Sequence, residues 1–150
     1  MIPNTFEIKD FRFLKDLSES QMESIFRISN FQEFAVKENL FEEYGALDTL
    51  YILLEGTVIL GMKVPKGKIS IGSIHPGSIL AWSALFPPAL SSASATAHTP
   101  VKALAIPAAK LLRIFEEDQS FGYVFMRMIG KTVSERLTDT RLQLVNVLSI

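Results

Sequence analysis

The sequence contains no cysteine, which excludes disulfide bonds, thiolate-held zinc, iron–sulfur clusters and a cysteine nucleophile. Histidine is also scarce. His75 and His98 form neither a His-x-His pair nor a His-Glu-x-x-His motif, so they give poor support for a metal centre. One of them could still serve a haem-type sensor as an axial ligand. The simpler interpretation places both histidines at the surface or in turns.

Long apolar runs and an excess of charge are missing as well. No stretch approaches the ~20 apolar residues needed to cross a bilayer, and residues 1–7 have neither the basic start nor the apolar run of a secretory signal. The formal net charge of -1 gives no long-range attraction to nucleic acid or to an anionic membrane. We therefore expect a cytoplasmic protein that contacts no membrane and does not bind nucleic acid directly.

Catalytic motifs are equally absent. The sequence has no glycine-rich P-loop and no Gly-x-Ser-x-Gly elbow. The acidic pairs Glu42-Glu43 and Glu116-Glu117 are interpreted as solvent-facing charge rather than as an acid–base pair. We expect no enzymatic activity.

The residues that are present suit one domain with a hydrophobic core, because 48% of the 150 residues are hydrophobic. Ser18 and Gln21 have the spacing of a capping box, which predicts a short helix that ends near Asn30. Over residues 31–106 short apolar runs alternate with turn signals, and Ile69 and Ile71 alternate with small or polar residues, as in a half-buried strand. Many short strands at this spacing predict a sandwich, roll or barrel.

Helical patterns interrupt and follow these strands. Residues 81–86 predict one or two helical turns, and residues 108–117 and 120–150 predict two further helices. The last helix is too long and too amphipathic to be buried whole, so its apolar stripe needs a partner surface. We predict a homodimer formed through Phe125, Ile129, Val133, Leu137, Leu144 and Val147. An alternative is that Phe125, Met126 and Met128 line a small-molecule or haem pocket.

Several segments, in their order and spacing, resemble the cyclic-nucleotide-binding domain of the Crp/Fnr family of regulators. Residues 40–41 and 50–58 resemble a pair of its β-roll strands with the glycine turn at Gly56. Residues 76–80 resemble the entry to its phosphate-binding cassette, and residues 135–144 resemble its long dimer helix. The resemblance implies a single α+β domain over residues 1–150. An antiparallel, jelly-roll-like β-roll (a double-stranded β-helix) would occupy about 31–106, and C-terminal helices about 107–150.

The resemblance also implies where a cyclic nucleotide would bind. In the family a short helix offers N–H groups to the cyclic phosphate, an arginine neutralises its charge, and a glutamate accepts a hydrogen bond from the ribose. The candidate cassette residues here are Ala81, Trp82, Ser83, Ala84, Leu85, Ser91, Ser92 and Ala93. The family's Gly-Glu pair falls on Ala81-Trp82 and its arginine on Ser91, so neither charge is kept. Two further glycines are lost near Tyr44 and Leu47.

These replacements leave two interpretations of the cassette. In the first, Trp82 plugs an obsolete pocket, and the hydroxyls of Ser91, Ser92, Ser94 and Thr96 are solvated groups at a strand edge. In the second, Trp82 walls a remodelled pocket or stacks on a planar ligand, and serine hydroxyls help to hold the phosphate.

Three functions remain open on this basis. The first is a regulatory domain with weak or lost affinity for cyclic AMP and cyclic GMP, which answers another small-molecule effector or serves as a dimer module. The second is a working cyclic-nucleotide receptor with an altered phosphate pocket, and the third is a haem- or metal-bound sensor. The sequence ends at Ile150, where Crp-type regulators continue into a helix-turn-helix. We therefore expect either a stand-alone sensor that acts through partners or the sensory half of a longer transcription regulator.

Overall fold

The computed structural model describes residues 13–149, which include helix α2 (Glu19–Ile28) at their N-terminal end. This helix begins at the predicted capping box. The Gln21 N–H donates to the Ser18 hydroxyl at 3.2 Å, and the Ser18 N–H donates to the Gln21 side chain at 2.9 Å. An N-cap of this kind stabilises a helix by ~1 kcal/mol. Met22 and Ile25 on the inner face of α2 are buried.

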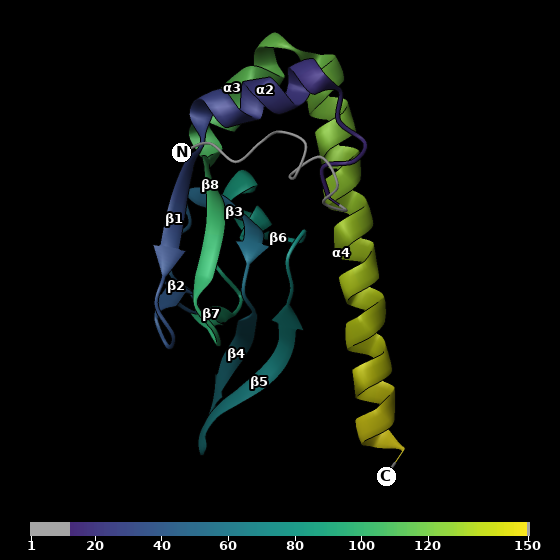
Figure 1. The fold of residues 1–150 in the computed structure, drawn as a ribbon. Helices are drawn as coiled ribbons and strands as arrows, with labels where there is room; N and C mark the ends of the chain where they lie inside the picture. Colours follow the sequence, from purple (N-terminus) through teal and green to yellow (C-terminus); the bar gives the residue numbers. More distant parts are fainter. Residues whose placement is uncertain (1–12, 150) are drawn as a thin grey trace.

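The body of the domain is a roll of two four-stranded sheets, and every pair of neighbouring strands is antiparallel (Figure 1). The strand orders are β1-β8-β3-β6 and β2-β7-β4-β5. The strands are β1 (Asn30–Phe34), β2 (Asn39–Phe41), β3 (Thr49–Glu55), β4 (Val58–Val64), β5 (Gly67–Ile74), β6 (Ile79–Leu80), β7 (Ser94–Ala97) and β8 (Val101–Pro107). The predicted α+β fold with an antiparallel β-roll is confirmed.

Two clusters of buried side chains hold the roll together. One fills its interior and includes small residues such as Ala95 and Ala97, which are 0% and 1% exposed. The other lies between the β1-β8-β3-β6 sheet and the helices, where Leu50 and Ile52 meet Phe125. Burying one such large side chain contributes roughly 1.5–3 kcal/mol. The β1-β8-β3-β6 sheet is therefore apolar on both faces: one face packs into the interior of the roll, and the other packs against the helices.

One sequence prediction about the strands is wrong. Ile69 was expected to be half-buried, but its side chain is 50% exposed. The reason is the position of β5, which lies at the edge of its sheet and pairs only with β4 among the described strands. The first half of β5 is exposed on both faces, so an alternating pattern there does not mark a buried face.

Three further helical segments complete the described part of the chain. The 3-10 helix η1 (Trp82–Leu85) follows β6, as the sequence predicted. Helix α3 (Ala108–Glu117) follows β8, and helix α4 (Gln119–Leu148) then runs alongside the roll (Figure 1). The predicted end of this last helix at Ile150 lies outside the described residues.

Helix α4 is buried at one end only. Phe121, Phe125 and Ile129 belong to the core, whereas every residue from 137 to 149 is exposed. Beyond Arg136, α4 is therefore exposed to solvent throughout the described residues. No helix within residues 13–149 has the length and apolar character needed to cross a membrane.

Candidate functional site

The segment that should form the phosphate cassette makes a sharp turn between β6 and η1. Ala81 sits at this turn with φ 62°, in the left-handed region that favours glycine. Adopting this region costs an ordinary residue ~1–2 kcal/mol. The geometry agrees with the resemblance, which puts a family glycine at Ala81. Ala81 therefore adopts a backbone conformation that a glycine would adopt without this cost.

A second residue in the left-handed region lies in the turn before β3, near the place where the resemblance implies a lost glycine. Tyr44 has φ 61° and its side chain is 69% exposed. Its N–H donates to the Ser91 carbonyl at 2.7 Å, and the Ser91 N–H donates to the Gly45 carbonyl at 3.0 Å. This turn therefore fixes the backbone of Ser91.

Ser91, which the resemblance places at the family's arginine, has a side chain that is fully engaged in hydrogen bonds. It is 5% exposed, its hydroxyl donates to the Ala93 carbonyl, and it accepts from the Ala93 N–H at 3.3 Å. Ser94 is also buried, at 2% exposure, and donates to the Gly61 carbonyl at 3.2 Å. The interpretation of these two hydroxyls as solvated groups is therefore wrong. Neither of them is free to hold a phosphate, because the fold itself uses their hydrogen bonds.

The predicted residues gather around a small cavity of about 80 Å³. Six of the eight candidates line it: Ala81, Trp82, Ser83, Ser91, Ser92 and Ala93. The other two, Ala84 and Leu85, turn into the hydrophobic core instead. Phe41, Leu47, Leu60 and Leu80 complete the apolar part of the wall. The cavity is smaller than the ~300–1,000 Å³ usual for ligand pockets.

The remaining residue of this cavity, Arg136, was not predicted from the sequence as a site residue. Its guanidinium carbon lies 4.3 Å from the centroid of the Trp82 ring, which is a cation–π contact. Its Nη2 donates to the carbonyl of Ile79 at 2.7 Å. Trp82 is also partly buried against the core cluster, so it contacts both the core and Arg136.

The charge of Arg136 is only partly solvated. Burial lowers the pKa of its guanidinium to about 10, and the neighbouring Asp139 carboxylate raises that pKa. The group therefore remains charged at neutral pH. Helical spacing offered a signal for its position, because Arg136 follows buried Met128 and half-buried Thr132 at intervals of four.

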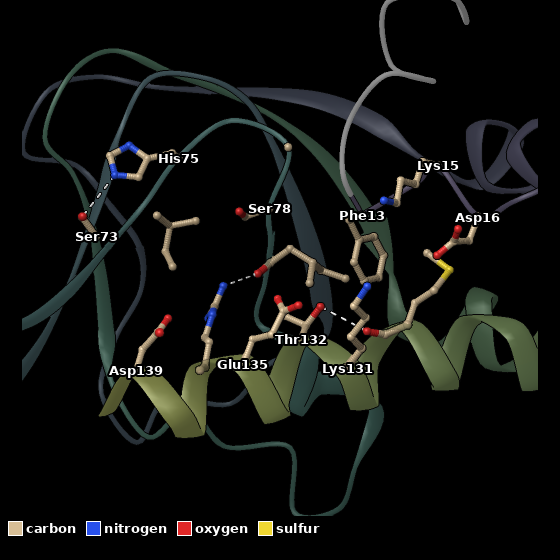
Figure 2. A pocket seen from close by; sticks show the side chains of 15 residues that line it. Phe13, Lys15, Asp16, Ser73, His75, Ser78, Lys131, Thr132, Glu135 and Asp139 are labelled. Carbon is tan, nitrogen blue, oxygen red and sulfur yellow. Dashed lines mark hydrogen bonds between the residues drawn. The ribbon is translucent and has the colours of Figure 1, made fainter. Parts of the chain in front are cut away.

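A second cavity, of about 210 Å³, lies on the other side of Arg136. Figure 2 shows Ser73 and His75 on one side of it and Lys15 and Asp16 on the other, with α4 along its base. Its charged groups are of both signs: Lys15, Lys131 and Arg136 against Asp16, Glu135 and Asp139. Because these charges balance, the cavity has no net preference for an anion or a cation.

The two histidines and the predicted small-molecule pocket are now placed. His75 lines the second cavity and shares a hydrogen bond of 3.3 Å with the Ser73 hydroxyl, while His98 is exposed. Within residues 13–149 no group of three His, Asp or Glu side chains could hold a metal ion. Met128 is buried in the core, and Met126 is partly buried against it.

The predicted dimer residues divide into two groups. Phe125 and Ile129 are 0% and 2% exposed and belong to the core. The other four, Val133, Leu137, Leu144 and Val147, are between 38% and 67% exposed. The N-terminal part of the stripe is therefore buried in the core, and the part from Val133 onward is exposed on the surface of α4.

Comparisons with known proteins agree on one family. The model of the cyclic nucleotide-binding domain matches residues 31–118. A structure from Geobacter metallireducens GS-15, described as that of a cyclic nucleotide-binding protein, is 31% identical, with a TM-score of 0.79 over 91% of this chain and 99% of that one. No curated protein sequence matches.

Two regulators share the fold at lower identity. The c-di-GMP-responsive regulator CLP of Xanthomonas campestris is 17% identical, with a TM-score of 0.77 over 87% of this chain and 65% of that one. The catabolite activator protein of Thermus thermophilus is 18% identical, with a TM-score of 0.73 over 91% of this chain and 62% of that one. From its matched residues and its fold, this chain belongs to the cyclic nucleotide-binding domain family.

Proposed function

We propose that this chain is a cytoplasmic regulatory sensor domain, without enzymatic activity, whose affinity for cyclic AMP and cyclic GMP is weak or lost. One observation carries this proposal: Trp82 and Ser91, which the resemblance places at the family's glutamate and arginine, both line the cavity formed by the cassette. The proposal treats the domain as a descendant of a nucleotide receptor that kept the fold and changed the pocket.

The geometry supports weak binding through lost charge. The hydroxyl of Ser91 is already bonded to Ala93, so it offers no substitute for a forked guanidinium. Trp82 offers no carboxylate to the ribose. A charge-assisted hydrogen bond is worth ~1.5–3 kcal/mol, so the loss of both groups lowers affinity by about two to four decades.

The geometry also supports weak binding through lost space. The side chain of Trp82 lines the cassette cavity and contacts both the core cluster and Arg136. A cyclic nucleotide would have to displace this ring before it could enter a cavity of about 80 Å³. The free energy needed for that displacement would be subtracted from the free energy of binding.

The competing proposal is a working receptor with an altered phosphate pocket. The name of the Xanthomonas regulator CLP, which calls it c-di-GMP-responsive, shows that a protein with this fold can answer an effector other than a cyclic mononucleotide. In this version Trp82 contacts the base or sugar, and Ser92 rather than Ser91 contributes a hydroxyl. Ser92 is exposed, and its hydroxyl bonds to no other residue within 13–149.

The proposed output is a homodimer through α4. Val133, Leu137, Leu144 and Val147 lie at intervals that alternate between four and three when Thr140 is included, as on the seam of a coiled coil. These side chains are between 38% and 67% exposed in the monomer. A second copy of the same helix would cover them symmetrically.

A thermal melt of the purified protein tests the proposal. Cyclic AMP, cyclic GMP and a cyclic dinucleotide are each added near millimolar concentration. A ligand at ~100 times its dissociation constant stabilises by ~2.7 kcal/mol, which raises the midpoint by several degrees. We expect no such shift with either mononucleotide. A clear shift with one of them would establish the competing proposal.

A further inference from the structure

The lining of the cassette cavity carries charge of one sign only, and the proposed function makes no use of this charge. Among the described residues that line it, Arg136 is the charged one, and no carboxylate is present. Apolar side chains and three serines make up most of the rest. A cavity with a positive wall and no negative group favours an anionic occupant over a neutral or cationic one.

Arg136 itself has unused capacity. A guanidinium carries five N–H donors, and within residues 13–149 Arg136 makes one hydrogen bond, to the Ile79 carbonyl. No carboxylate in that range lies within ion-pairing distance of it. The neighbouring Asp139 carboxylate acts on this charge without a direct ion pair, and it offsets only part of the cost of burying the guanidinium. The structure thus keeps a charge that packing alone does not require.

Further donors face the same cavity. The hydroxyls of Ser83 and Ser92 line it and bond to no other residue in the described range. A hydroxyl can donate one hydrogen bond to an oxygen of an anion. These two serines and the arginine come from three different parts of the chain: η1, the segment before β7, and α4.

We propose that this cavity binds an oxyanion, with Arg136 of helix α4 as its receptor in place of the arginine that the family carries at Ser91. The inference rests on the proposed function, because it assigns the chemistry of an effector to the same pocket. The size of the cavity favours a small anion. About 10–15 Å³ holds one water molecule, so the observed volume of about 80 Å³ accommodates a group of phosphate or sulfate size.

Two kinds of ligand could supply an oxyanion to this cavity. It is either a free ion or the phosphate group of a larger ligand, and the larger ligand requires Trp82 to move. In both cases the anion engages α4 directly, since Arg136 lies on the same helix as the exposed stripe at Val133 and Leu137. Occupancy of the pocket is thereby coupled to the position of that helix.

The test is a thermal melt of the full chain at pH 7.5 with sodium sulfate, with potassium phosphate and with cyclic AMP, each compared with sodium chloride at equal ionic strength. The variants are Arg136→Met, which keeps the packing volume and removes the charge, and Arg136→Lys, which keeps the charge without the fork. Lys131→Met is the matched control, because Lys131 lies on α4 but lines only the second cavity. Baseline melts show which variants remain folded.

We expect a saturating rise of the midpoint with sulfate or phosphate in the wild type and in Lys131→Met. Arg136→Met should weaken the apparent affinity by at least about tenfold, and Arg136→Lys by less, because a charged hydrogen bond is lost. No saturating rise in the wild type, or an equal rise in Arg136→Met, overturns the inference, because general salt effects act on any protein. A rise lost in Lys131→Met alone also overturns it, since the anion then binds in the second cavity.

The cyclic AMP arm separates the two proposals. If sulfate binds through Arg136 and cyclic AMP causes no shift, both proposals stand and the source is a free ion or another phosphate compound. If cyclic AMP binds tightly and equally in the wild type and Arg136→Met, both proposals fail. If cyclic AMP binds tightly and Arg136→Met loses it, the arginine is the receptor but weak nucleotide binding is refuted.

Discussion

The guanidinium of Arg136 lies over the ring of Trp82, with 4.3 Å between the guanidinium carbon and the ring centroid. This contact joins the long helix α4 to the 3-10 helix η1, two elements that are far apart in the sequence. The same guanidinium donates to the Ile79 carbonyl in β6. Arg136 thus links the cassette to the helix that carries the exposed apolar stripe.

The contact between Arg136 and Trp82 should be measurable as a coupling energy. We predict that a double-mutant cycle of Arg136→Met and Trp82→Leu gives about 0.5–2 kcal/mol, as expected for a partly desolvated cation–π pair. Urea unfolding of the four proteins measures it. Arg127→Met is a suitable control, because Arg127 is exposed on the same helix and bonds only to the Tyr123 hydroxyl in the described range. A coupling energy near zero would show that the two side chains are merely adjacent.

Restoring the family's charges should restore affinity. We predict that the double variant Trp82→Glu with Ser91→Arg binds cyclic AMP or cyclic GMP at least 100-fold more tightly than the wild type, because two charge-assisted contacts are worth several kcal/mol. Equilibrium binding of a fluorescent cyclic nucleotide measures the change, after a melt has shown that the variant is folded. An unchanged affinity in a folded double variant would mean that charge and space at these two positions do not limit binding.

Tyr44 should be a source of strain that glycine relieves. Its φ of 61° costs ~1–2 kcal/mol, which glycine would not incur. Glycine destabilises the folded state by ~0.5–1 kcal/mol, because it loses more chain entropy on folding. Tyr44→Gly should therefore stabilise the protein by about 0.5–1 kcal/mol. The matched control is Tyr123→Gly, at a helical position where the side chain is 66% exposed and glycine costs ~1 kcal/mol. Opposite signs in urea unfolding are expected, and destabilisation by both substitutions would refute the account of the turn.

The exposed stripe of α4 should control assembly. We predict that Leu144→Glu makes the protein monomeric without lowering the stability of the fold, because Leu144 is 56% exposed and contacts no core. Leu142→Glu is the control, since Leu142 is 58% exposed but lies two positions away, on another face of the helix. Sedimentation at several concentrations measures the result. A wild type that is already monomeric at high micromolar concentration would refute the dimer.

The charge of Arg136 should contribute no pH dependence near neutrality. A basic group whose pKa is lowered by folding destabilises the folded state in its charged form. This penalty is fully present below the folded pKa of about 10 and is relieved only as the pH rises above it. We therefore predict that the stabilities of wild type and Arg136→Met differ by a constant amount from pH 6 to pH 9. Urea midpoints across that range test this. A difference that changes across that range would contradict this prediction.

The sequence predicted the parts of the fold that depend on local patterns. The capping box at Ser18 and Gln21 and the helical turn that begins at Trp82 follow from spacing and residue type alone. The exposure of Ile69 did not follow, because it depends on which strand lies at the edge of the sheet. Strand order is set by long-range packing, which a local pattern does not encode.

The candidate site was predictable to a similar extent. The resemblance identified Trp82 and Ser91 as replacements for charged residues, and the structure brings both to one cavity. The resemblance gave no indication that the Ser91 hydroxyl donates its hydrogen bond to the Ala93 carbonyl. That contact depends on the turn at Tyr44, which fixes the Ser91 backbone. Nor did the resemblance indicate Arg136, whose place in the cavity depends on how α4 packs beside β6.

A calorimetric titration of the wild-type protein with cyclic AMP, and separately with cyclic GMP, tests the central claim most directly. With Trp82 and Ser91 in the cassette, we predict no saturable heat until the nucleotide approaches about 1 mM, where binding contributes only ~4 kcal/mol. A one-to-one isotherm with a dissociation constant near 1 μM would correspond to ~8 kcal/mol and would contradict the claim.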